Sequence, residues 1–250
     1  MRSLHSLSPL LWICLSAALY LGQVSPSWGH GLDLGRPDAH APLSIMGDHT
    51  HRQGEWMASY RLMRMDMAGM RNGSDSVTSA EVFAANYTVT PLEMTMDMHM
   101  AGLMWAPSDQ WTLMAMVNYL DISMDHRIFP MAAPLINLNG GSETFTTSSE
   151  GLGDTKVSAL YTFHSQAGQQ LHMGLGLSLP TGSIDEQDLI PGPGGRIPRI
   201  MPAPMELGSG TYDLEPSLTY NLQYSAWSFG LQGRGVLRLE DENDQGYRRG

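Results

Sequence analysis

The feature that most constrains this chain is a long segment in which apolar and polar side chains alternate. Across residues 211–224 every even position is apolar or aromatic and every odd position is polar. A period of two over this length indicates a β-strand, because successive side chains of a strand point to opposite faces. Strands of soluble sheets usually have ~5–6 residues. This segment is long enough to cross a bilayer at a tilt, which needs ~9–11 residues.

The same alternation recurs along the chain. The predicted strands are residues 56–62, 92–105, 111–119, 155–163, 171–179, 211–224 and 227–239. Tyr224 and Trp227 flank a two-residue turn, as aromatic girdles do at a membrane surface. The sequence therefore predicts an all-β fold, an antiparallel outer-membrane β-barrel or an incomplete barrel with about seven long strands visible.

The connections between these strands alternate in length. Short turns are predicted at 106–110, 164–170 and 225–226, and long loops at 68–91, 127–150 and 183–208. Outer-membrane barrels have short periplasmic turns, long extracellular loops and an even number of strands. Because seven is odd, we expect the barrel to be incomplete at its C-terminus.

The second predicted strand leaves two alternatives open. Trp105 lies beside a turn and should face lipid, which would turn His99 and Asp97 outward as well. Either a β-bulge switches the register, or these two residues lie above the apolar band.

The N-terminus is typical of a secretory signal peptide. Arg2 precedes an apolar stretch over residues 7–21, and small residues follow near Gly29. We expect three parts: a signal peptide over 1–29, a periplasmic segment over 30–53, and the barrel over 54–250. The single cysteine, Cys14, falls in the first part, so the mature chain would have no disulfide.

Composition and motifs exclude several functions. The formal net charge is −11 and Lys156 is the only lysine, which argues against binding nucleic acid, since phosphates need clustered cations. The sequence has no nucleophile elbow, no phosphate-binding loop and no His-Glu-x-x-His motif. We expect no enzymatic activity, and we expect outer-membrane lipid as a partner.

The polar face of the later strands supplies candidates for lining a lumen. Its charged members are Asp154, Lys156, Asp213, Glu215, Arg234 and Arg238. Mixed charges on facing strands are typical of a barrel interior. The set could act in selectivity, or it could be an ion-pair network that supports the barrel.

Methionine is unusually frequent, with 19 residues, and on the first and third strands it lies opposite the aromatic face. Thioethers bind soft ions such as Cu(I) or Ag(I), and a His-x-His pair can also hold metal. The candidate metal ligands are His49, His51, Met94, Met96, Met98, His99, Met100, Met114 and Met116. The alternative is that methionine fills irregular space or lines a path for apolar solutes, and that an ordinary polar segment contains the histidines. No other cofactor is expected.

Several segments resemble a family of outer-membrane transporters labelled for the meta-pathway of phenol degradation. They include APLSIMGDHTHRQGEWMASY from Ala41, MTMDMHMAGLMWAPSDQWTLMAM from Met94, GLGDTKVSALYTF from Gly151, GLGLSLPTG from Gly174 and LGSGTYDLEPSLTY from Leu207. The resemblance covers essentially the whole mature chain. It implies a β-barrel with a transport role, in a family whose members are longer than this chain, and it supplies no substrate.

Three functions follow as expectations. The first is a transporter or channel that moves a small solute, organic or soft metal, across the outer membrane. The second is a barrel that binds metal at its methionine- and histidine-rich side without transport. The third is a structural or adhesive barrel that acts through its long loops. The sequence does not set the solute or the oligomeric state.

Overall fold

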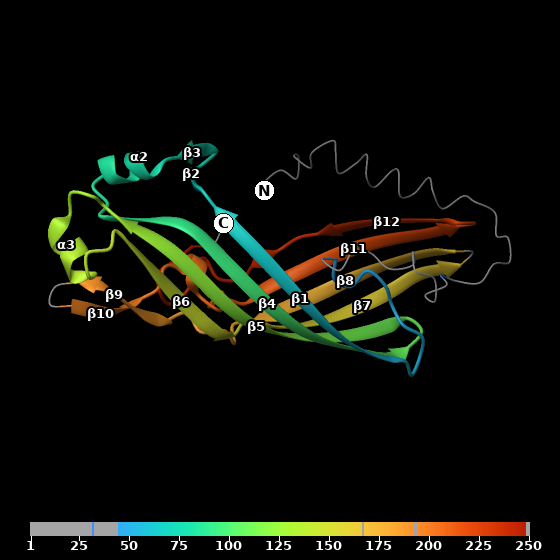
Figure 1. Ribbon diagram of the computed structural model, residues 1–250. Coiled ribbons are helices and arrows are strands. Elements are labelled where there is room, and N and C mark those ends of the chain that lie inside the picture. Colours follow the sequence, from blue (N-terminus) through green and yellow to red (C-terminus); the bar gives the residue numbers. More distant parts are fainter. Residues whose placement is uncertain (1–31, 33–44, 167, 193–194, 249–250) are drawn as a thin grey trace, which may run out of the picture.

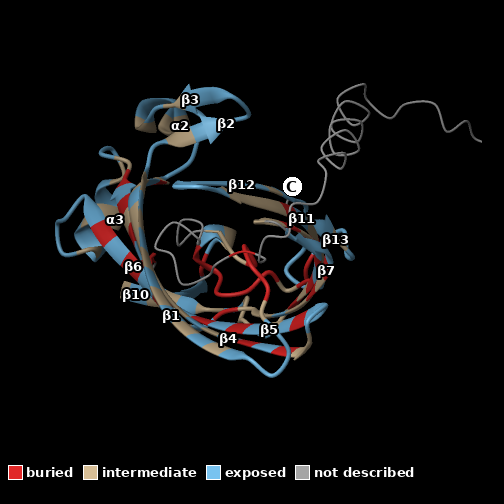
Figure 2. Ribbon diagram, turned by 90° about the vertical axis from the view of Figure 1, so that its right-hand side faces the viewer, coloured by how far each residue is buried: buried red, intermediate tan, exposed pale blue. Residues whose placement is uncertain are grey.

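The computed structural model describes residues 32, 45–166, 168–192 and 195–248. The predicted signal peptide over 1–29 lies outside the described residues. One antiparallel sheet dominates this part of the chain and curls into an open trough (Figures 1 and 2). None of the described helices has both the length and the apolar character needed to cross a membrane.

The sheet contains nine strands by hydrogen bonding, but they fill seven positions. Its path is β1 (Trp56–Ala68), β4 (Val89–Ser108), β5 (Trp111–Ile128), β7 (Thr155–Gln166), β8 (Gln169–Leu179), β11 (Asp213–Tyr224) and β12 (Trp227–Arg234). Next to this path, β6 (Thr144–Leu152) pairs with the second half of β5, and β13 (Leu237–Arg238) pairs with β11. The predicted seven-strand antiparallel arrangement is thereby confirmed.

The two ends of the sheet differ. The hairpin turns between β4 and β5, β7 and β8, and β11 and β12 are short, and Tyr224 lies directly opposite Trp227. We call this the turn end; the long connections lie at the other end, the loop end (Figure 1). The long connections contain β2 (Met70–Asn72), β3 (Asp75–Val77), α2 (Ser79–Ala84), α3 (Ala133–Leu138), β9 (Gln187–Gly192), β10 (Gly195–Ile200) and η2 (Ala203–Met205).

The prediction that residues 127–150 form a loop is wrong at both ends of this range and holds for residues 129–143. β5 continues to Ile128, and β6 begins at Thr144. The physical reason is that β6 has hydroxyl side chains on both faces, so it lacks the apolar alternation by which a half-buried strand is recognised. Its threonines still favour extended backbone, because β-branched side chains pack well on a pleated sheet.

The register of β4 decides between the two alternatives left open for its polar residues. Pairing with β1 runs without interruption from Trp105, opposite Trp56, to Glu93, opposite Ala68. The described irregularities of β4 lie outside this stretch, between Pro91 and Glu93 and after Trp105. No bulge switches the register, so His99 and Asp97 share the convex face with Trp105.

The convex face has an apolar band between two groups of aromatic residues. At the turn end, Trp56 stacks on Trp105 with ring centroids 5.3 Å apart, and Trp111 contacts Tyr161 at 4.9 Å. Nearer the loop end, the Tyr60 hydroxyl lies 2.6 Å from Nδ1 of His99. Beyond that level the convex face becomes charged, and Nη1 of Arg64 lies 3.4 Å from Oδ2 of Asp97. His99 and Asp97 therefore lie at the edge of the apolar band and above it.

The hydrophobic core lies inside the trough, not on the convex face. Leu120, Ile122 and Met124 of β5 are buried against the connection that precedes β11. The residues of that connection in the cluster are Met201, Met205 and Leu207. The third long connection therefore folds back along the concave face (Figure 2).

Candidate functional site

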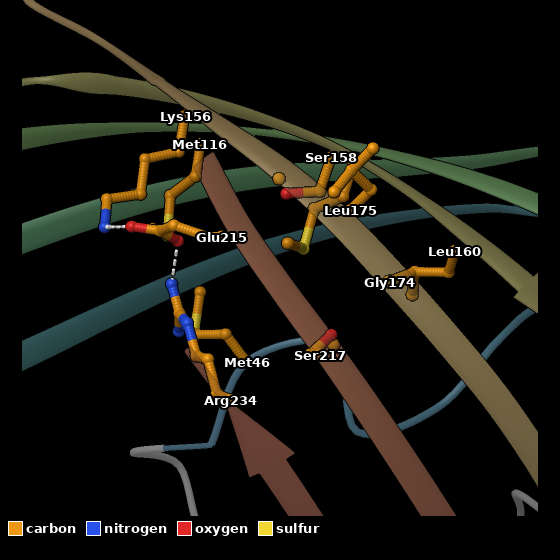
Figure 3. Close-up of a pocket in the computed structure, with 13 residues that line it drawn as sticks. Met46, Met116, Lys156, Ser158, Leu160, Gly174, Leu175, Glu215, Ser217 and Arg234 are labelled. Atoms are coloured by element: carbon orange, nitrogen blue, oxygen red, sulfur yellow. Dashed lines mark hydrogen bonds and ion pairs between the residues drawn. The ribbon is translucent and has the colours of Figure 1, made fainter. Parts of the chain in front are cut away.

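The concave face has a polar half on β7, β8, β11 and β12. At its centre the buried carboxylate of Glu215 is paired with two cations (Figure 3). Lys156 donates from Nζ to Oε1 at 2.6 Å, and Arg234 donates from Nη2 to Oε2. These residues lie on β7, β11 and β12, so one carboxylate joins three of the sheet's seven positions.

The other predicted charged residues divide into two roles. Arg238 donates from Nη1 to Oδ2 of Asp213 at 2.9 Å, so this pair extends the ionic cluster. Asp154 instead accepts the backbone N–H groups of Gly182, at 3.1 Å, and Ser209, at 2.7 Å. The structure therefore places five of the six predicted residues in ion pairs, whereas Asp154 holds two loop segments together.

A segment without helix or strand, residues 45–51, crosses the concave face. We call it the internal strap. Asn221 donates to the carbonyl of Asp48 at 2.6 Å, Nε2 of His172 lies 2.9 Å from the carbonyl of Gly47, and Thr112 accepts the N–H of His51 at 3.0 Å. Side chains of β5, β8 and β11 therefore form hydrogen bonds with the backbone of the strap.

The hydroxyl of Thr50 adds a further contact to the same segment. It lies 3.0 Å from the hydroxyl of Thr162 and accepts from the amide of Gln170 at 2.9 Å. All three side chains are buried. Because these bonds are shielded from water, each is costly to leave unmade.

The strap also contacts both edges of the sheet path. Arg61 of β1 donates to the carbonyl of Ile45 at 3.4 Å and to the sulfur of Met46. Gln232 of β12 donates to the carbonyl of Met46 at 3.1 Å. Within the described residues β1 pairs only with β4, and β12 pairs only with β11. The strap therefore connects from inside the two strands that form the ends of the path.

Glycines on β8 leave room for this packing. A Cβ added to Gly174 would lie 2.5 Å from the hydroxyl of Ser217, and one added to Gly176 would lie 2.9 Å from that of Ser158. Real Cβ atoms do not approach this closely, so larger residues would push neighbouring side chains toward the strap. Of the inward positions of β8, 174 and 176 therefore favour glycine.

A pocket lies between the internal strap, the ion pairs of Glu215 and the methionines of β5 nearest the turn end (Figure 3). Met46, Met114 and Met116 line one part of it, and Lys156 and Glu215 line another. The pocket thus places thioethers beside a paired carboxylate.

The other half of the concave face, on β1, β4 and β5, is rich in methionine. Residues directly opposite each other share a face, and the pairing places Met63 opposite Met98, Met65 opposite Met96, and Met67 opposite Met94. Met94 in turn faces Met124 of β5. We call these seven residues the loop-end methionine cluster. Nearer the turns, a separate row joins Met57, Met104 and Met114.

The predicted metal ligands do not form one group. His99 lies on the convex face, because it alternates with the methionines on either side of it. His49 contacts His51 ring to ring, with centroids 4.9 Å apart, and Nδ1 of His49 lies 2.8 Å from Oδ1 of Asp48. Within the described residues no three His, Cys, Asp or Glu side chains are placed to hold a metal ion. A histidine-based metal site therefore has no geometric support, whereas the methionines do gather.

The residues that hold the strap were not singled out from the sequence. They are Thr112, Thr162, Gln170, His172, Asn221 and Gln232. Each sits at a polar position of an alternating strand, which predicts only that it faces inward. The only sign in the sequence of a segment that packs against these residues is the polar, glycine-containing run before β1, residues 47–54.

No family model matches the chain and no match to a curated protein was found, so the resemblance to the phenol-degradation family has no support from these two searches. A crystal structure of an outer membrane channel from Pseudomonas putida F1 is similar at 14% sequence identity and a TM-score of 0.49. The match covers 82% of this chain and 64% of that channel.

Proposed function

We propose that this chain forms the wall of an outer-membrane channel or transporter through which a small solute crosses. In this proposal the convex face contacts lipid, the concave face lines the path, and no catalysis is involved. The short turns lie on the periplasmic side and the long connections on the extracellular side. The single observation that carries the proposal is that the sheet exposes an apolar band on its convex face and buries ion pairs and other polar side chains on its concave face.

The convex face supports the contact with lipid. Tyr224 is 75% exposed and Trp227 is 79% exposed, and every strand of the sheet path has exposed large apolar residues. Water-soluble monomers rarely expose apolar patches of more than a few hundred Å². From Trp111 to Tyr119 the band measures ~27 Å along the strand at ~3.4 Å per residue. A tilt of ~40° reduces this to ~20 Å, close to the ~25 Å band of outer-membrane barrels.

The concave face supports an aqueous path. Glu215 and Asp213 are buried there with their cationic partners, and buried hydroxyl, amide and imidazole groups surround them. Groups of this kind would be costly on a surface that faces hydrocarbon. The internal strap crosses this path, so we propose that it narrows the path and that its release widens it.

Planar-bilayer recording of the refolded full chain tests this function. We expect discrete conductance steps, and larger steps when the strap is loosened by Thr50→Val together with Asn221→Leu. Both substitutions remove hydrogen bonds to the strap and keep the side-chain size similar. The channel proposal is wrong if neither the wild type nor the loosened variant conducts under conditions in which a known porin does.

A second candidate is a barrel that binds its solute without conducting it. The observation that favours it is the filling of the trough by two segments, the internal strap and the connection containing Met205 and Leu207. It predicts solute binding without conductance, so the same recording separates the two candidates.

A further inference from the structure

Methionines are distributed unevenly between the two faces of the sheet. On β1, β4 and β5 all of them point to the concave side, whereas the convex positions of these strands hold aromatic, aliphatic and polar residues. In the rest of the described sheet, Met173 of β8 is on the convex face. If methionine served only as an apolar residue in these strands, it should also occur at their lipid-facing positions.

The loop-end methionine cluster brings its sulfurs within reach of one another. Directly opposed residues of antiparallel strands have Cβ atoms ~4.5–5.5 Å apart, and successive rows on one face are ~7 Å apart. The thioether side chain has three rotatable bonds. Two or three sulfurs of neighbouring rows can therefore converge on a single ion without movement of the backbone.

The chemistry of the cluster selects for soft ions. Its ligands are thioethers, and the acidic residues that alternate with them, such as Asp66 and Asp97, lie on the opposite face. Thioethers favour Cu(I), whereas Ca²⁺, Mg²⁺ and Zn²⁺ need oxygen, nitrogen or thiolate ligands. Arg61, in the next row toward the turns, places a positive charge at the lower boundary of the cluster.

We propose that the loop-end methionine cluster is a binding site for a soft monovalent metal ion, Cu(I) or Ag(I). The site lies on the concave face beside the long connections. Binding at this site does not depend on the proposed channel activity. If the protein is also a channel, soft monovalent metal ions would be one class of solute that enters the path at its extracellular end.

Packing alone does not account for the cluster. Met94, Met96 and Met98 contact the core formed by Leu120, Ile122 and Met205, so part of their role is to fill space. Leucine or isoleucine would define such a core better, because methionine is flexible. The cluster uses methionine at all six inward positions from 63 to 67 and from 94 to 98. A requirement for sulfur explains this choice.

Titration of the full chain, refolded in detergent, tests the site without any transport measurement. The probes are Ag(I), and Cu(I) in competition with a chromogenic chelator. We expect the wild type to bind both ions. The variant Met65→Leu/Met96→Leu, which removes the middle row, should bind at least tenfold more weakly or lose one equivalent. Leucine has a similar volume, so the fold should be retained.

The matched control is Met173→Leu, which makes the same chemical change on the convex face and should bind like the wild type. X-ray absorption of the silver-loaded or copper-loaded wild type should show sulfur as the ligand atom. The proposal is overturned if the wild type does not bind either ion, if the middle-row variant binds as tightly as the wild type, or if the bound ion has nitrogen or oxygen ligands. If the middle-row variant does not fold, the absorption spectrum decides alone.

Discussion

Nζ of Lys156 donates to Oε1 of Glu215 at 2.6 Å, across the width of β8. The second oxygen of the same carboxylate accepts from Arg234. Glu215 is buried, and its two partners are more exposed. One carboxylate therefore pairs with two cations from strands on either side of it, more ion pairs than any other described residue of the concave face makes.

Replacing this carboxylate should destabilise the sheet more than replacing one of its cations. Glu215→Gln leaves Lys156 and Arg234 without their counter-charge, whereas Lys156→Met leaves the pair with Arg234 in place. Breaking a buried pair costs ~3–5 kcal/mol, and solvent screening of the half-exposed cations reduces this to roughly 1–3 kcal/mol here. Denaturant unfolding in lipid vesicles measures both variants. Equal or greater destabilisation by Lys156→Met would contradict the central position of Glu215.

The internal strap should control access to the interior. Thr50→Val with Asn221→Leu removes three of its hydrogen bonds to the sheet. A cysteine placed at Ser158, which lines the pocket, reports access of a charged thiol reagent. We expect the labelling rate to rise at least several-fold in the loosened variant. The control is Thr95→Val on the convex face, and a rate unchanged by loosening would mean that the strap does not limit access.

Glycine at 174 should be required for packing under the strap. Gly174→Ala would put a Cβ 2.8 Å from Cδ2 of Leu160 and still closer to Ser217. Overpacking of this kind costs typically ~1–3 kcal/mol. Gly233→Ala is the matched control, because a Cβ there meets nothing within 4 Å. Denaturant midpoints should fall for Gly174→Ala alone; a similar fall in both variants would contradict a packing requirement specific to position 174.

Asp154 should act on loop structure and not on conductance. Asp154→Ala removes the acceptor for the N–H groups of Gly182 and Ser209. We expect the connection to open and trypsin to cut faster after the exposed Arg196 and Arg199. Asp185→Ala is the control, because the described hydrogen bonds of its side chain are to Ser183 only two residues away. Cleavage at the wild-type rate in Asp154→Ala would contradict this role.

The sequence predicts much of the sheet because its information is local. Alternation in 211–224 and the aromatic pair Tyr224 and Trp227 give the strand, its turn and its outward face without knowledge of any distant residue. The short turns predicted within 164–170 and at 225–226 follow from the same pattern. Opposed methionines could also be expected on one face, although their pairing needed the register of β1 and β4.

What the sequence does not predict depends on distant contacts. The bond between Asn221 and Asp48 joins residues 173 positions apart, and no periodic pattern records it. The polar residues of β6 are paired with β5 and covered by the connection around Met205, so they need no apolar face of their own. His49 and His51 lie on the internal strap and His99 lies on the convex face, so the three predicted histidines do not come together.

The account rests on the assignment of the convex face to lipid, and β8 tests it most directly. Single cysteines carrying a nitroxide can be placed at residues 171–173, 175 and 177–179 of the full chain in lipid vesicles, which leaves the close-packed Gly174 and Gly176 unchanged. The sole native cysteine, Cys14, is replaced by serine for this purpose. Electron paramagnetic resonance then measures collision with oxygen, which concentrates in the bilayer, and with a water-soluble nickel complex.

We predict high oxygen accessibility at the odd positions, including 173 and 175, and low oxygen accessibility at the even positions, which face the strap. A profile without this period of two, or one in which the odd positions collide with the nickel complex and not with oxygen, would contradict the account.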